Sequence, residues 1–183
     1  MKKVLLIIGV LGFLSSCDKL KELASANFGL NGDAAEVTVP KTGSQSSIII
    51  QSTTETIDFE AEIKKNNAEL AAKYIKSVTI NSIDLEIISS PKALPNNWKN
   101  LKSYSFSINS DVKADKINIA SADPYSASSE TKINIPVNTT VDLKDYVKEK
   151  AKFTYTFNGT LNEPTTDSLK VKIKANYQIK VGL

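Results

Sequence analysis

The chain has 183 residues, with 23 basic and 20 acidic side chains and a formal net charge of +3. Every basic residue is a lysine and histidine is absent, so the commonest general base, the commonest nitrogen ligand of zinc and the bidentate phosphate clamp of arginine are all missing. We therefore expect no metal, no cofactor and no nucleic-acid partner, because nucleic-acid binding needs clustered basic charge. Enzymes can still work with carboxylates, serine and lysine, but the composition favours a non-enzymatic protein.

Residues 1–16 have the organisation of a secretory signal peptide. Two lysines precede an unbroken apolar run from Val4 to Leu14, and two serines follow it. This order of basic, apolar and small residues is typical of a segment that is removed from the mature protein. The apolar run is shorter than the roughly 18–20 residues that a membrane-spanning helix needs.

The end of this segment, Leu14-Ser15-Ser16-Cys17, resembles the lipobox of bacterial lipoproteins. The resemblance implies cleavage before Cys17 and attachment of diacylglycerol to its sulfur, usually with an added acyl chain. Two or more acyl chains give stable membrane anchoring, at about 0.8 kcal/mol for each buried methylene. The alternative is a chance cysteine in an ordinary signal peptide. Since Cys17 is the sole cysteine, we expect no disulfide.

The residues after Cys17 bear on location. Asp18 resembles the inner-membrane retention mark of enterobacterial lipoproteins, but the composition, rich in Lys, Asn, Ser and Ile, resembles that of lipoproteins from Bacteroidota, where that rule does not apply. We expect the cell envelope, and the outer membrane within it, with the periplasmic and surface faces both open. Residues 17–34 are predicted to be the lipidated N-terminus and a flexible tether, although 19–26 could form a short helix. A single β-rich domain is predicted over 35–183.

The predicted domain is dominated by apolar residues in alternation, the pattern of half-buried strands. Strands are expected over 35–39, over 46–63 with a break at 53–56, and over 78–88 with a bulge or bend at Asn81-Ser82. One helix is expected from the cap residue Asn66 to Ile75. Further strands are expected at 104–108, 117–119, 133–137, 153–157 and 169–181, with a helical turn at 141–147 and a turn or bulge at Asn158-Gly159. This order predicts a mainly β antiparallel sandwich, immunoglobulin-like or related, with one or two short helices; a curved, barrel-like sheet is the alternative.

Few residues are candidates for a site. Trp98, with Tyr104 and Tyr125 near it in sequence, could form a ligand or partner surface that stacks on a sugar, or could plug one end of the core. The sequence Asp167-Ser168-Leu169 resembles the short O-glycosylation motif of Bacteroidota, which makes Ser168 a candidate acceptor. The acidic residues at 142, 145 and 149 have neither the spacing nor the glycine of a calcium loop.

Residues from about 75 to the C-terminus resemble uncharacterised β-sandwich envelope lipoproteins of Bacteroidota, on the basis of Ser77 to Ile87, the segment Val141-Asp-Leu-Lys-Asp-Tyr and the aromatic strand after it. The resemblance implies an envelope location and no catalytic residues. We therefore expect a non-enzymatic, lipid-anchored envelope protein that serves as a binding or structural module for another envelope component, either a protein or a glycan. The alternative is a periplasmic carrier that holds lipid or another apolar ligand in a cavity of the β domain.

Overall fold

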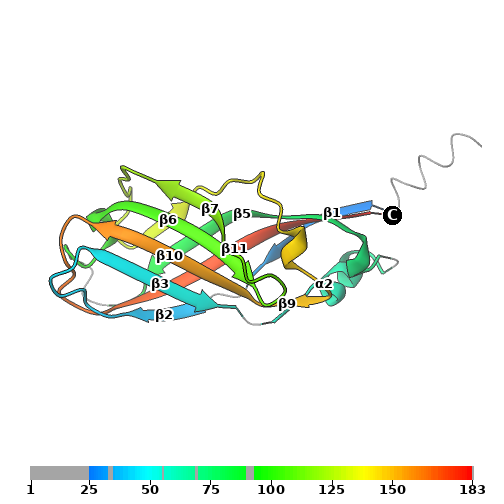
Figure 1. The fold of residues 1–183 in the computed structure, drawn as a ribbon, viewed down its shortest axis with the longest axis horizontal. Helices are drawn as coiled ribbons and strands as arrows, with labels where there is room; N and C mark the ends of the chain where they lie inside the picture. Colours follow the sequence, from blue (N-terminus) through cyan, green and yellow to red (C-terminus); the bar gives the residue numbers. More distant parts are fainter. Residues whose placement is uncertain (1–24, 33–34, 55, 69, 90–92, 183) are drawn as a thin grey trace, which may run out of the picture.

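The computed structural model describes residues 25–32, 35–54, 56–68, 70–89 and 93–182, which form an antiparallel β-sandwich (Figure 1). Its strands are β1 (Ser25–Asn31), β2 (Ala35–Val39), β3 (Ser47–Thr53), β4 (Ile57–Asp58), β5 (Ile75–Ile87), β6 (Leu101–Ser110), β7 (Ile117–Ala122), β8 (Lys132–Ile135), β9 (Lys150–Ala151), β10 (Phe153–Leu161) and β11 (Leu169–Gly182). The helical segments are α2 (Phe59–Asn66) and three 3-10 turns at Ala72–Tyr74, Trp98–Asn100 and Lys144–Tyr146. In these described ranges no helix has the length and apolar character that crossing a bilayer requires.

Two separate sheets make the sandwich. One sheet has the order β1-β11-β5-β8, with β2 also paired to β11, and the other has the order β3-β10-β6-β7. All these pairs are antiparallel, and a small β4–β9 pair lies beside α2 (Figure 1). The prediction of an antiparallel sandwich is confirmed, and the alternative of one curved sheet is not what the chain forms.

The long strand β11 is the axis of the first sheet. Strand β5 pairs along one side of it, while on the other side β2 pairs with residues 169–173 and β1 with residues 176–182. Residues 25–31 therefore belong to the folded domain, and the predicted tether over 17–34 is wrong for this stretch. Ala26, Phe28 and Leu30 alternate and pack against the core, a short period-two signal that the polar neighbours obscured.

The core lies between the sheets and is built from the inward residues of each strand. Phe153 and Tyr155 of β10 face Tyr177 of β11, with the rings of Phe153 and Tyr177 stacked at 5.3 Å between centroids. The hydroxyls of Tyr155 and Tyr177 also hydrogen-bond to each other across the two layers. Large aromatic side chains thus fill the space between the sheets at this level, as interiors packed to crystal-like density require.

Strand β5 contains the bulge that its sequence predicts. Ser82 pairs with Asn176 and Ile80 with Tyr177, so Asn81 is an extra residue without an opposite partner on β11. The extra residue moves the buried side chains from even positions, such as Val78 and Ile80, to odd positions from Ile83 onward.

The helix predicted from Asn66 to Ile75 is wrong, because the α-helix in this part of the chain spans Phe59–Asn66. Phe59 and Ile63, predicted to lie in a strand, are buried four residues apart on α2. The side chain of Asp58 accepts a hydrogen bond of 2.9 Å from the backbone N–H of Ala61 and caps the helix, and this bond, with Lys150, lowers the pKa of Asp58. Asn66, the predicted cap, is the last residue of α2, and Ile75 begins β5.

Gly159 lies inside a strand rather than at a turn. Strand β10 continues through Asn158 and Gly159, and Gly159 pairs with Ile48 on one side and Tyr104 on the other. A Cβ atom here would come within 2.9 Å of Leu101 Cδ1 and Phe157 Cε1. The residue is glycine because core side chains close over it. Of the two alternatives predicted here, the turn is wrong, and the irregularity of β10 against β6 lies just beyond, between Thr160 and Leu161.

Candidate functional site

Trp98, Tyr104 and Tyr125 come together at one end of the core. The ring of Tyr104 lies 4.9 Å from that of Tyr125 and 5.8 Å from that of Phe157, and the ring of Trp98 lies 6.1 Å from that of Phe157. Trp98 is only 2% exposed and Tyr104 4%, so neither can offer a ring face to a ligand. Tyr125 alone is partly exposed. These residues close the end of the core, which is the second of the two interpretations made from sequence.

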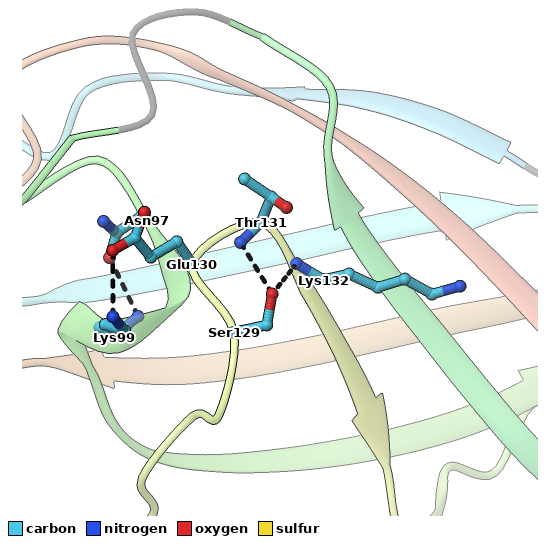
Figure 2. A network of polar contacts seen from close by, with 6 residues as sticks. All are labelled: Asn97, Lys99, Ser129, Glu130, Thr131 and Lys132. Carbon is cyan, nitrogen blue, oxygen red and sulfur yellow. Dashed lines mark hydrogen bonds and ion pairs between the residues drawn. The ribbon is translucent and has the colours of Figure 1, made fainter.

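Polar contacts hold the Trp98 turn in place (Figure 2). The backbone N–H of Trp98 donates to the carbonyl of Glu130, and Lys99 Nζ forms an ion pair of 3.0 Å with the Glu130 carboxylate. Ser129 Oγ accepts from the backbone N–H groups of Thr131 and Lys132 just before β8. The loop that precedes β8 thus fixes the turn that carries the tryptophan.

Two polar atoms of this cluster, Trp98 Nε1 and Tyr104 Oη, are buried and have no hydrogen-bond partner among the described residues. We expect Tyr104→Phe to leave the free energy of unfolding unchanged or to raise it by up to about 1 kcal/mol, because a buried unpaired hydroxyl is costly. Tyr155→Phe is the matched control: it leaves the buried hydroxyl of Tyr177 without its partner and should lower the free energy of unfolding by about 1–3 kcal/mol.

Urea unfolding followed by the fluorescence of the single tryptophan measures both variants. Equal destabilisation by the two substitutions would contradict the prediction.

Burial raises the pKa of both Tyr155 and Tyr177, so both hydroxyls stay protonated in the folded state. The stability that this gives is present below the ordinary tyrosine pKa of about 10 and is lost as the pH rises above it.

The other predicted residues lie apart from this cluster. Cys17 is outside the described residues. Ser168 is exposed in the loop before β11. Its neighbour Asp167 accepts a hydrogen bond of 2.8 Å from the side chain of Asn96, so the loop is held while the serine hydroxyl faces solvent.

No group of three or more metal-ligating side chains occurs in the part of the chain that the structure describes. An open surface pocket of about 570 Å³ lies beside the Ala72–Tyr74 turn and is lined by Ala72, Lys73 and residues 147–150. Four of its six lining residues are charged. A pocket of this kind does not suit an apolar ligand.

The feature that sets this molecule apart is the outer face of the sheet β3-β10-β6-β7. Apart from Ile49 and Lys102, the latter at a bulge at the start of β6, its described outward side chains are serine, threonine, asparagine or glutamine. We call this surface the hydroxyl–amide face. It comprises Ser47, Ile49, Gln51 and Thr53 of β3, Thr154, Asn158 and Thr160 of β10, Lys102, Ser103, Ser105, Ser107 and Asn109 of β6, and Asn118 and Ser121 of β7. Thr156 of β10 lies in the same row but is buried by its neighbours.

The strand register places these side chains in rows across the sheet. Asn158, for example, lies opposite Ile49 on one side and Ser105 on the other, and Ser105 lies opposite Ser121. Thr53 Oγ1 and Thr154 Oγ1 are 3.1 Å apart within another row. Adjacent strands are about 4.8 Å apart and alternate residues along a strand about 6.8 Å apart, so the rows form a regular array of donors and acceptors.

The opposite outer face of the sandwich has a different chemistry. It carries Lys170, Lys172 and Lys174 on β11, with Glu36 on β2 opposite Lys172 and Asp84 on β5 opposite Lys174. Mixed charge is the ordinary condition of a solvent-facing sheet and discourages association between edges. The three lysines thus belong to an ordinary solvated face, and the near absence of charge on the hydroxyl–amide face is the exception.

The sequence analysis missed the hydroxyl–amide face, although the signal is present in the chain. Each of the strands β3, β6 and β10 was predicted from its apolar residues, and the residues between them were treated only as solvent-facing. Taken together, those intervening residues contain one charge, Lys102. What the sequence could not supply is that these three strands are neighbours in one sheet.

Comparisons with known proteins do not assign a family. No protein-family model matches the chain, and no curated protein matches its sequence. Among solved structures, the VP2 subviral particle of infectious bursal disease virus aligns with 86% of this chain at 8% identity and a TM-score of 0.41, and the chain spans 33% of VP2. A carbohydrate-binding module of the β-sandwich superfamily aligns with 82% of this chain and 54% of its own length, at 10% identity and a TM-score of 0.33. The functional proposal therefore rests on the residues of this chain alone.

Proposed function

We propose that this protein is a non-enzymatic, lipid-anchored module of the bacterial cell envelope whose hydroxyl–amide face binds an uncharged glycan. The observation that carries the proposal is that a four-stranded face has a single charged side chain among its described residues, Lys102 at the bulged end of β6. Ile49 is its one large apolar residue.

The chemistry of this face matches that of a neutral sugar chain. Hydroxyl and carboxamide side chains both donate and accept hydrogen bonds, as the hydroxyls of a sugar do. A charged ligand would find only one ion-pair partner there, Lys102 at the bulged end of β6. Each neutral hydrogen bond contributes only about 0.5–1.5 kcal/mol net, so the affinity of one module should be modest, and many copies on one membrane would raise it by avidity.

A charged substitution at the centre of the face tests the proposal. Asn158 is exposed and lies between Ile49 and Ser105, so Asn158→Lys would place a long cationic side chain over the array. Thr79→Lys adds the same charge to β5, in the other sheet, and is the matched control. Binding of the full-length chain to neutral polysaccharides, such as glucans, mannans, xylans and galactans, is measured by affinity electrophoresis.

We expect the parent chain and the Thr79→Lys variant to be retarded equally by at least one of these glycans, and Asn158→Lys to lose that retardation. Retardation that Asn158→Lys does not change would show that the glycan binds elsewhere. Binding restricted to acidic glycans would also overturn the proposal, because the only cation of the face is Lys102 at the bulged end of β6.

The packing of the core favours a binding module over a carrier. A carrier of lipid needs an apolar cavity between the sheets, whereas at the level of Phe153 and Tyr177 stacked rings and paired tyrosine hydroxyls occupy that space. Organic extraction of the purified protein tests this: a stoichiometric lipid beyond the covalent anchor would support the carrier instead.

The proposed location in the outer membrane rests on the lipobox resemblance and on composition. Proteinase K digestion of intact cells, with a periplasmic protein as leakage control, decides between the two faces of that membrane. Loss of the domain from intact cells would place it on the surface, where it meets external glycans. Protection until lysis would place it in the periplasm, where the neutral glycan must be an envelope component.

A further inference from the structure

We propose that two copies of this chain join through strand β3, edge to edge and antiparallel, so that the sheets β3-β10-β6-β7 of both copies become one continuous sheet. The contact at the twofold axis is Ile49 of one copy against Ile49 of the other. The inference concerns assembly and stands whether or not the hydroxyl–amide face binds a glycan.

Strand β3 has an unused edge. It pairs with β10 on one side. Strand β2 of the other sheet lies close to β3 but pairs with β11, and in the described part of the chain no strand pairs with the other side of β3. The N–H of Thr54 donates to Phe153 O, and the N–H of Leu161 donates to Ser46 O, both at 2.8 Å. Since backbone groups of alternate residues point the same way in an antiparallel ladder, even-numbered residues of β3 face β10. The N–H and C=O groups of Ser47, Ile49, Gln51 and Thr53 therefore point outward.

This edge lacks the usual protection against pairing. Proteins block exposed edges with charged side chains, proline, bulges or very short strands, and β3 runs for seven residues, Ser-Ile-Ile-Ile-Gln-Ser-Thr, without any of these. The other edge strands differ. Strand β2 contains Glu36, β8 has only four residues including Lys132, and β7 is interrupted by a bulge opposite Phe106 and Ser107. Strand β1 is also uncharged, but it is interrupted by Gly29, which has no side chain to pack against a partner strand.

The side chain of Ile49 selects the partner and the register. It is 68% exposed, one of two large apolar side chains so exposed among the described residues, the other being Leu94 in a loop. An antiparallel pairing of β3 with a second β3 that sets Ile49 opposite Ile49 also sets Ser47 opposite Gln51. All of these are residues whose backbone groups point outward, so the twofold register satisfies the free hydrogen-bonding groups and covers the exposed isoleucine at once.

A contact of this kind closes on itself. The same edge is used by both copies, so the interface is isologous and the assembly stops at two. The outer edges of the joined sheet are then the two bulged β7 strands, which do not template further pairing. The two hydroxyl–amide faces become one surface of eight strands.

Cross-linking tests the register directly. Residues opposite each other in a hydrogen-bonded antiparallel pair have Cα atoms about 5.5 Å apart, within the range that a disulfide spans. The full-length protein with Ile49→Cys, purified in detergent, should form a disulfide-linked dimer on mild oxidation. The parent chain controls for any dimer formed through Cys17, and Gln51→Cys controls for register, since two such residues lie about four positions apart across the axis.

A charge test distinguishes loss of association from loss of folding. Ile49→Lys places two ammonium groups opposite each other and should leave the protein monomeric, while Ser121→Lys, on the other edge strand of the same face, should leave it dimeric. The protein mass is measured by sedimentation equilibrium at a solvent density matched to the detergent, and circular dichroism checks that each variant is folded.

A parent chain that is monomeric at its highest soluble concentration would overturn the proposal. So would Gln51→Cys cross-linking better than Ile49→Cys, or Ile49→Lys remaining dimeric.

Discussion

Replacing Phe157 by alanine is expected to lower the free energy of unfolding by about 3–5 kcal/mol, the usual cost of truncating a buried phenylalanine. Phe157 is fully buried, and its ring contacts the rings of Trp98, Tyr104 and Phe106 at centroid distances of 6.1, 5.8 and 6.3 Å. Three aromatic neighbours from two chain segments cannot close over the cavity without breaking their own packing. Since domains of this size are stable by only about 5–15 kcal/mol, the variant should lose about a fifth or more of its stability.

Thermal unfolding followed by circular dichroism measures this loss, which corresponds to a fall in Tm of roughly 6–20 °C for a domain of this length. Ile49→Ala, on the outer face of the same sheet, is the control and should stay within about 0.5 kcal/mol when measured on monomer. A loss below about 1 kcal/mol for Phe157→Ala would mean that the aromatic cluster is not packed as described.

Replacing Cys17 by serine is expected to abolish fatty-acid labelling of the protein. The proposed thioether needs the sulfur of Cys17, and the chain holds no second cysteine to replace it. Cells fed a radiolabelled or alkyne-tagged fatty acid should label the parent protein, while Cys17→Ser should show only background at equal protein amount. Labelling is preferred to fractionation because an unprocessed signal segment could hold the variant at the membrane on its own.

Lys19→Ser is the matched control for that experiment, because it changes a residue near the anchor and keeps the sulfur. It should be labelled like the parent. An unlabelled parent chain, or a Cys17→Ser variant that keeps its label, would refute lipidation at this position. Mass spectrometry of the N-terminal peptide would then give the processing that does occur.

How much of the fold the sequence predicts depends on how local the deciding interaction is. Strands β2 and β11 and the bulge at Asn81 follow from alternation alone, because burial on one side of a sheet imposes period two directly. For residues 59–63 the alternation of apolar and polar residues predicted a strand, which is wrong. Phe59, Ala61 and Ile63 fit a strand, but Phe59 and Ile63 also fit one helix face, and the Asp58 cap decided the outcome. Asp58 is a recognisable helix cap in the sequence, but the prediction followed the longer alternating pattern of apolar residues.

Other elements depended on contacts that no local pattern reports. Strand β1 exists because the C-terminal half of β11 has a free side for it to pair with. Gly159 was predicted at a turn because Asn-Gly is a strong turn signal, whereas Leu101 and Phe157 closing over its α-carbon keep it in a strand. For the candidate site, proximity in sequence correctly grouped Trp98 with Tyr104 and Tyr125. Their burial depends on Phe157, which lies in a distant segment of the chain.

The pairing of β1 with the last half of β11 has a mechanical consequence. Ser25 lies opposite Gly182, and the ladder runs inward from that end of the sandwich to Asn31 opposite Asn176. With the lipid on Cys17, only residues 18–24 separate the bilayer from this ladder, a reach of at most about 25 Å. Force on a captured ligand would pull β1 lengthwise against β11 and load the whole ladder together. A lateral pull would instead peel its bonds apart one after another. In the proposed anchored state, the strand nearest the anchor would thus be loaded in shear, the direction in which a ladder resists most strongly.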